Sequence, residues 1–352
     1  MHNALTIAWA TYQDTVRRPL YYILIGVFIV LVYTSHFLTL FTFNQEANMV
    51  REMGVASLAL WGFLIFAILT PVVVTQELED RTAITLLAKP LTRSAFLVGK
   101  YLGLLAAVFL GLVVLGGVLF FTLWWMTRGD FMGAEPGLAL KLLGAGLALL
   151  GGGGALHLRS LRLDPDSPSA AWSRRCVFLL YVLGATALLV AAVFSSGDRG
   201  RADVAWQMKD LKAITPMKFV WEFLRANGVI VLEGLFLSFL QVALLGAICV
   251  SLAAFLPAVV SVAGTALVFI LGNLSNYLLA SVEASGSAPA RAAARGLYYL
   301  VPNLGYFNLQ THFSEGSIIS PGYLAFALLH ASLYTGIVFL VSCALFERRE
   351  IR

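Results

Sequence analysis

The stretch IVLEGLFLSFLQVALLGAICVSLAAFLPAVVSVAGTALVFILGNLSNYLLA, residues 230–280, decides the fold class. Its only charged residue is Glu233, and nearly all of the rest is apolar or small. A membrane-spanning helix needs about 20 consecutive apolar residues, so this run is long enough for two. Proline cannot continue a helix without losing a backbone hydrogen bond, and Pro257 lies in the middle of the run. We predict two membrane-spanning helices, 230–256 and 257–280, joined by a very short turn.

The composition of the whole chain points the same way. Hydrophobic residues make up 59% of the 352 residues and charged residues 12%, whereas an average soluble domain has about 25% charged residues. The sequence therefore predicts an all-α, polytopic membrane protein of about eight transmembrane helices, forming a single domain over 1–352. The six further spans that we expect from their apolar runs are 20–41, 54–75, 101–126, 138–156, 176–195 and 321–346.

The run 138–156 is the weakest of these spans. It contains Lys141 and the four glycines Gly151–Gly154, and glycine is a poor helix former although membrane helices use it for close packing. If this run does not cross the membrane, 157–175 lies on the outer side and the number of spans changes. The role of 127–229, predicted to be an inserted hairpin followed by an outer loop, stays open.

Lysine and arginine orient the spans, because cytoplasmic segments carry an excess of both. The short segments 42–53 and 127–137 carry one base each. We therefore expect both termini in the cytoplasm and an outer loop at 281–320. The predicted inner segments, with 2, 4, 4 and 3 bases respectively, are 1–19, 76–100, 157–175 and 347–352.

The first 19 residues precede any span and have helical periodicity. Arg17-Arg18-Pro19 would end the helix, since proline disfavours helical geometry at the residue before it. We predict an amphipathic helix over 4–18 that lies in the membrane interface against lipid headgroups. Its apolar stripe consists of Leu5, Ala8, Trp9, Tyr12 and Val16.

The chain shows no nucleotide site of its own. A phosphate-binding loop has the form G-x-x-x-x-G-K-[ST], so that backbone N–H groups surround the phosphates. The nearest counterpart, Gly99-Lys100-Tyr101, has Ser94 at the first glycine position and Tyr101 in place of the magnesium-binding hydroxyl. The bases lie at the ends of apolar runs, so no nucleic-acid partner is expected. We expect a chain that is not itself an enzyme.

No metal or cofactor site is expected either. The five histidines do not occur at ligand spacing, and Cys176, Cys249 and Cys343 are widely spaced in or beside apolar runs, as small apolar fillers are. Four ionisable residues lie in or near spans: His36, Lys141, Glu233 and His330. Two interpretations stay open for each. The side chain has a structural role, in which it forms a hydrogen bond or extends to the membrane interface, or it has a functional role.

The most polar segment of the first half is TQELEDRTAITLLAKPLTRSAFLVGKY, residues 75–101. Asp80 to Lys89 has the periodicity of a short amphipathic helix, with acids at its start and a base at its end, as the helix dipole favours. Pro90 ends it. Thr92 can cap the next helix, which runs through Lys100 into the third span.

This segment resembles the first cytoplasmic loop of type-2 exporter permeases of the ATP-binding-cassette (ABC) class. The pattern is E-x-E-x-x-T-x-x-x-L-L-x-K-P-x-x-R-x-x-x-x-x-G-K, from Glu77 to Lys100. Arg81 stands where many members have glycine and resembles the subgroup linked to copper-enzyme maturation. The family typically has six spans, so 127–229 would be an insertion. Three further stretches that resemble the family are the helix at 4–18, Val301-Pro302-Asn303-Leu304 with Phe307-Asn308, and the ending Phe346-Glu347-Arg348-Arg349-Glu350-Ile351.

The resemblance implies a subunit of the bacterial cytoplasmic membrane that works with partners. A separate ABC ATPase subunit, which binds ATP and magnesium, would dock on the loop helix, and a second permease copy or a paralogue would complete the complex. It implies that Glu79, Thr82, Leu86 and Leu87 lie near the ATPase groove, whereas Arg93 and Lys100 reach lipid headgroups. The full set of residues matching the coupling motif is Glu77, Glu79, Thr82, Leu86, Leu87, Lys89, Pro90, Arg93 and Lys100.

Two alternatives stay open. An ion-coupled secondary carrier would transport without ATP, although the middle of the spans has few charges for such a mechanism. A non-transporting scaffold would bind a cytoplasmic partner through the same loop. The substrate is not encoded in any pattern found here: spans rich in Leu, Phe and Gly fit an apolar cargo, and equally a device that transmits force without moving a solute.

Overall fold

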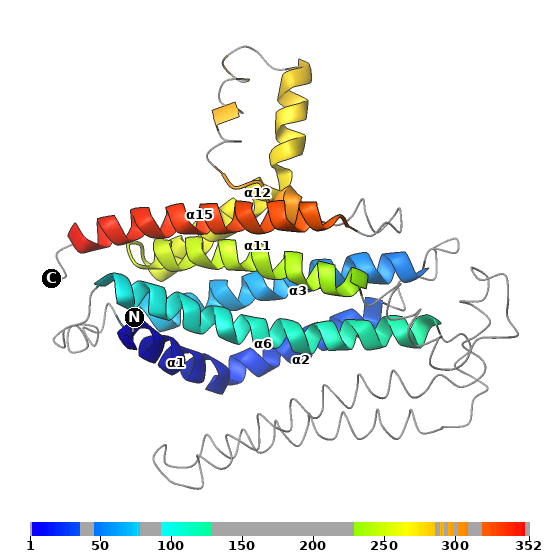
Figure 1. Cartoon of the computed structure of the whole chain (residues 1–352), viewed down its shortest axis with the longest axis horizontal. Coiled ribbons are helices and arrows are strands. Elements are labelled where there is room, and N and C mark those ends of the chain that lie inside the picture. The colour runs from blue at the N-terminus through cyan, green and yellow to red at the C-terminus, as the bar shows by residue number, and fades with distance from the viewer. Residues whose placement is uncertain are drawn as a thin grey trace, which may run out of the picture. The chain divides into compact units, whose positions relative to one another are not determined.

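The computed structural model describes residues 2–35, 46–75, 77, 93–127, 229–285, 289, 291, 295–296, 298, 301–308 and 319–348. This part of the chain is helical with short connections and contains no strand, which confirms the all-α prediction for it. The helices (Figure 1) are α1 (His2–Arg17), α2 (Pro19–Ser35), α3 (Glu46–Thr70), the π-helix η2 (Pro71–Thr75), α6 (Arg93–Thr127), α11 (Val229–Ala253), α12 (Ala258–Ser285), the 3-10 helix η6 (Leu304–Phe307) and α15 (Pro321–Arg348).

Several of these helices are long and apolar enough to cross a membrane. The five that qualify alone are Met49–Thr75, Ser94–Phe120, Val231–Ala253, Ala258–Tyr277 and Pro321–Phe346. A sixth results if α1 and α2 form one span broken at Arg18. The chain is therefore a membrane-embedded helical protein. The predicted spans 138–156 and 176–195 lie outside the described residues, so the count of eight stays a prediction.

The prediction that Pro257 separates two helices is confirmed. α11 ends at Ala253 and α12 begins at Ala258. Pro257 lies directly before α12, where its missing N–H costs nothing. Its carbonyl accepts a hydrogen bond from the Ser261 amide at 3.0 Å, which forms the first turn of the new helix. The two long helices are thus joined by a tight turn.

The chain divides into two compact units, which are described separately. The first unit comprises Met1–Val16, Ala59–Gly111 and Phe236–Arg352, and the second comprises Arg17–Leu58 and Leu112–Leu235. Several helices begin in one unit and end in the other. The predicted coupling loop and the last three long helices therefore belong, wholly or mostly, to the first unit.

Aromatic rings packed on glycines form the centre of the first unit. Trp61 and Phe66 are fully buried on α3. A Cβ added to Gly111 would fall 1.8 Å from the Trp61 ring, and one added to Gly246 would fall 2.3 Å from the Phe66 ring. Only glycine lets each ring lie directly on the neighbouring backbone. These contacts hold α3, α6 and α11 close together.

The outer helices of the first unit present apolar side chains outward. Exposed leucines, isoleucine and phenylalanine occur along α15, among them Leu333, Ile337 and Leu340. On α12, Val259, Leu267 and Ile270 are exposed in the same way. Apolar exposure on this scale fits a hydrocarbon surrounding rather than water.

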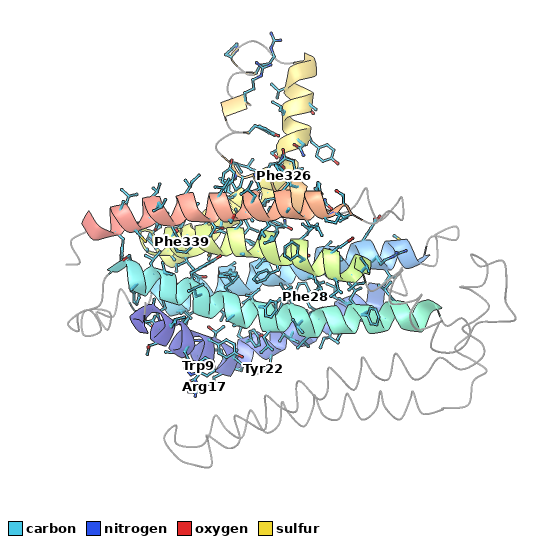
Figure 2. All side chains as sticks on the ribbon, in the orientation of Figure 1. Trp9, Arg17, Tyr22, Phe28, Phe326 and Phe339 are labelled. Atoms are coloured by element: carbon cyan, nitrogen blue, oxygen red, sulfur yellow. The ribbon has the colours of Figure 1, made fainter. Side chains whose placement is uncertain are left out.

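A helix is present at the N-terminus as predicted, but α1 runs from His2 to Arg17 rather than over 4–18. Two residues of its apolar stripe are exposed, Trp9 (labelled in Figure 2) at 62% and Leu5 at 60%, whereas Ala8, Tyr12 and Val16 are half-buried. Thr11 and Thr15 are buried instead. A helix that buries threonines and exposes tryptophan fits a surface in contact with lipid.

The second unit contains α2 and the remaining parts of α3, α6 and α11. Within it, a Cβ on Gly54 would fall 2.1 Å from Leu119, and one on Gly116 would fall 2.5 Å from Leu235. Glu233, one of the open ionisable residues, is buried near the start of α11. Glu233 therefore lies inside the protein rather than reaching into solvent.

Candidate functional site

The candidate site is the base of the predicted coupling segment, where α3 ends and α6 begins. Glu77 and Lys100 have described side chains, and Arg93 has a described backbone as the first residue of α6. The prediction that one helix runs from this point into the third span is confirmed. The expected helix 80–89 lies outside the described residues, and so do the predicted site residues Glu79, Thr82, Leu86, Leu87, Lys89 and Pro90.

Glu77 and Lys100 form an ion pair. The Lys100 Nζ donates to Glu77 Oε1 at 2.5 Å, with side-chain exposures of 8% for the lysine and 31% for the glutamate. Lys100 also lies over the ring of Phe96, 5.6 Å from its centroid, because residues four apart share a helix face. Lys100 is therefore buried against Glu77, and its predicted contact with lipid headgroups stays a prediction.

The ion pair joins the two chain ends that flank residues 78–92. Glu77 follows the end of α3, and Lys100 lies about two turns inside α6, which begins at Arg93. A pair with one partner buried restrains its ends more firmly than an exposed surface pair would. The two chain ends that flank residues 78–92 are thus tied together.

The approach to this base from α3 is irregular. The last turn, Pro71–Thr75, is a π-helix whose residues are almost all buried. Proline lacks the N–H that an α-helix would use there, and π turns occur frequently at functional sites. Thr75 Oγ1 donates to the carbonyl of Ala253 at 3.3 Å. The end of α3 is therefore attached to the end of α11.

The start of α6 contacts α1. A Cβ on Gly99 would fall 2.9 Å from the carbonyl oxygen of Ala4, and one on Gly103 would fall 2.5 Å from that of Ala8. Two glycines four apart let the helix backbones touch, as in small-xxx-small packing. α1 therefore packs directly beside Lys100, on the turn of α6 that carries it.

A second region held by side-chain hydrogen bonds surrounds Asn303. This residue belongs to the stretch Val301-Pro302-Asn303-Leu304, which precedes the last span. Its amide nitrogen donates to Asn276 Oδ1 at 2.8 Å and to the Tyr298 hydroxyl at 3.4 Å, and its oxygen accepts from the Gly305 amide at 2.9 Å. Asn303 therefore caps η6 and attaches it to α12. Between α12 and η6 the described residues Pro289, Arg291, Arg295, Gly296 and Tyr298 are helical.

Aromatic side chains gather beside this cap. The Tyr323 hydroxyl donates to the Tyr306 carbonyl at 2.7 Å, and a hydrogen bond to Tyr298, together with burial, raises the pKa of Tyr306. The rings around His330, with centroids 4.8 to 6.2 Å from its own, belong to Tyr306, Phe307, Phe326 and Tyr334. This placement favours packing as the role of His330.

The remaining candidates show no second reactive centre in the described residues. Cys249 donates to the Phe66 carbonyl at 3.6 Å and is buried, as a core filler is, and Cys343 is also a free thiol. Within the described ranges no three His, Cys, Asp or Glu residues gather as metal ligands would. Cys176, His36 and Lys141 lie outside the described side chains.

Sequence reasoning missed Pro71 and Thr75. Pro71 breaks the apolar run of 54–75 close to its end, a signal that could have indicated an irregular last turn. The partner of Thr75, Ala253, is 178 residues away, and no local pattern encodes such a pair. The contact of Glu77 with Lys100 was likewise absent from the motif, although both residues belong to it.

No protein-family model matches the chain, and no curated protein sequence matches it.

Proposed function

We propose that the chain is the membrane-spanning permease subunit of an ABC exporter in the bacterial cytoplasmic membrane. A separate ATPase subunit, carrying ATP and magnesium, docks on residues 78–92 and drives the spans through their base. The chain has eight spans with both termini in the cytoplasm, and a second permease copy or a paralogue completes the pair. The chain itself hydrolyses no ATP.

The observation that carries this proposal is the Glu77–Lys100 ion pair, which ties together the two chain ends that flank residues 78–92. A polar segment bearing the exporter motif leaves and rejoins two membrane helices at the Glu77–Lys100 pair. Thr75 joins the same base to α11, and Gly99 joins it to α1. Force applied to the segment is therefore passed within a few residues to two further helices, α11 and α1. A loop whose only role is to connect two spans would need none of these attachments.

Co-purification tests the proposal. The tagged chain is isolated in mild detergent together with ATPase subunits encoded by neighbouring genes, and ATP hydrolysis is measured in lipid nanodiscs. We expect one ATPase to remain bound and Glu79→Lys to release it, because a reversed charge opposes docking. The matched control is Glu135→Lys, the same change in a predicted outer segment, which should leave binding intact.

The outcome separates the alternatives. Transport that follows a proton or sodium gradient and persists without ATP would replace the proposal with a secondary carrier. A bound partner whose ATP hydrolysis is indifferent to the chain would identify a scaffold. Binding that survives Glu79→Lys as well as Glu135→Lys would remove residues 78–92 from the interface.

A further inference from the structure

The π-helical turn Pro71–Thr75 is the irregular element nearest the base of the segment. In a π-helix each amide bonds five residues back, so the turn holds an extra residue relative to an α-helix. Pro71 has no N–H to place in either register. Changing this turn from the π to the α register would rotate all that follows by about 100°, the angle of one helical residue.

Two side-chain contacts sit directly after this turn and depend on its register. Thr75 reaches the carbonyl of Ala253, the last residue of α11, where helix carbonyls lack an intrahelical partner. Glu77 reaches Lys100. A rotation of about 100° would carry both side chains to another face of the helix, so neither contact can persist in the α register.

The turn also touches the helix that follows. η2 packs against α12, and the short connection 254–257 between α11 and α12 begins right after the carbonyl that Thr75 holds. Phe255 in that connection packs edge-on against Phe346 near the end of α15. A change in the turn therefore reaches three long helices through contacts already present.

We propose that Pro71–Thr75 is a register switch, held in the π form by the Glu77–Lys100 pair and by the Thr75–Ala253 hydrogen bond. Opening the ion pair releases the turn to the α register, which rotates the start of residues 78–92 and detaches Thr75 from α11. Thr75 is a positioning residue in this account. The switch is a property of the chain alone, and only its trigger, a docked ATPase, rests on the proposed function.

The burial pattern of the turn supplies a readout. In the π register Val73 and Val74 are 1% and 0% exposed, whereas Val72 is half-buried. A rotation of about 100° must change which of these positions is accessible. Cysteine placed at each position would therefore report the register through its rate of reaction with a membrane-permeant maleimide.

The experiment uses the full chain in lipid nanodiscs with no ATPase present. Val72→Cys, Val73→Cys and Val74→Cys are labelled separately, and modification is read peptide by peptide by mass spectrometry. In the otherwise native chain, position 72 should react about tenfold faster than positions 73 and 74, which wait for local opening. With Glu77→Gln added, position 73 or 74 should react as fast as position 72.

Companion variants keep the test decisive. Lys100→Gln opens the same pair from the other side, and Thr75→Val removes the hydroxyl at constant shape, so each should shift the labelling as Glu77→Gln does. Thr75→Ser keeps the hydroxyl and should retain the native pattern. Glu52→Gln, on α3 away from the base, is the matched control and should also retain it.

An unchanged labelling pattern in Glu77→Gln, Lys100→Gln and Thr75→Val overturns the switch. So does an equal rise at all three positions, which would indicate local unfolding rather than rotation. Because no ATPase is present, failure here leaves the docking proposal standing. Loss of ATPase binding would conversely leave the switch intact.

Discussion

At the scale of single residues, the Glu77–Lys100 pair is the contact on which the account depends most. Lys100 is almost fully buried and Glu77 is about one-third exposed. Removing one partner leaves the other charge in a poorly hydrated place, which costs more than losing a surface pair. The pair is therefore a structural restraint as well as a part of the motif.

Charge reversal tests this pair. Glu77→Lys alone and Lys100→Glu alone should each lower the free energy of unfolding by about 1–3 kcal/mol, because each places like charges together. The double exchange should recover most of that loss, measured by thermal unfolding in nanodiscs. Additive losses in the double variant would show that the two side chains do not interact.

The packing of α1 on α6 has its own residue-scale test. Gly103→Ala places a Cβ 2.5 Å from the Ala8 carbonyl oxygen, and the backbone must shift to admit it. We expect a loss of about 1–3 kcal/mol, as for other overpacked sites. Stability is read from the midpoint of thermal unfolding.

Gly117→Ala is the matched control on the same helix, since nothing lies within 4 Å of its added Cβ. This variant should be neutral or slightly stabilising, because alanine is the better helix former. Equal destabilisation by both variants would indicate a general intolerance of α6 rather than the contact with α1.

At the scale of elements, the regular helices could be predicted and their irregular ends could not. Apolar length predicted the long helices, and Pro257 marked the turn between α11 and α12 correctly. The π turn could not be predicted because hydropathy contains no information on the hydrogen-bond register of a helix. The contact of Lys100 with Glu77 could not be predicted, because a base near a span usually extends to the headgroups and only the fold brings Glu77 beside it.

The attachment of η6 to α12 is the element whose chemistry is easiest to dissect. Asn303→Ala removes both the cap and the bridge to Asn276 and should cost about 1–2 kcal/mol. Asn303→Asp keeps the acceptor for Gly305 but loses the donor to Asn276. Its stability should therefore lie between that of the native chain and that of Asn303→Ala. The midpoint of thermal unfolding measures the stability of each variant. If the aspartate variant is as unstable as the alanine variant, the whole loss is due to the hydrogen bond with Asn276.

At the scale of the whole molecule, the central expectation is its orientation in the membrane. The connection 254–257 should face the cytoplasm, and the stretch at 301–308 the outside. Leu256→Cys and Asn308→Cys place thiols at exposed positions in these two places. In intact cells an impermeant maleimide should label position 308 and spare position 256. The reverse pattern would invert the topology and remove residues 78–92 from the cytoplasm.

The most direct measurement of the central claim is photo-cross-linking from the coupling segment itself. Benzoylphenylalanine replaces Leu87 in one strain and, as the control, Glu135 in another, and cells are irradiated. We expect position 87 to form an adduct with a protein carrying an ATP-binding motif, identified by mass spectrometry, and position 135 to form none. No ATPase adduct at position 87, or the same adduct from position 135, would contradict the claim that residues 78–92 receive the ATPase.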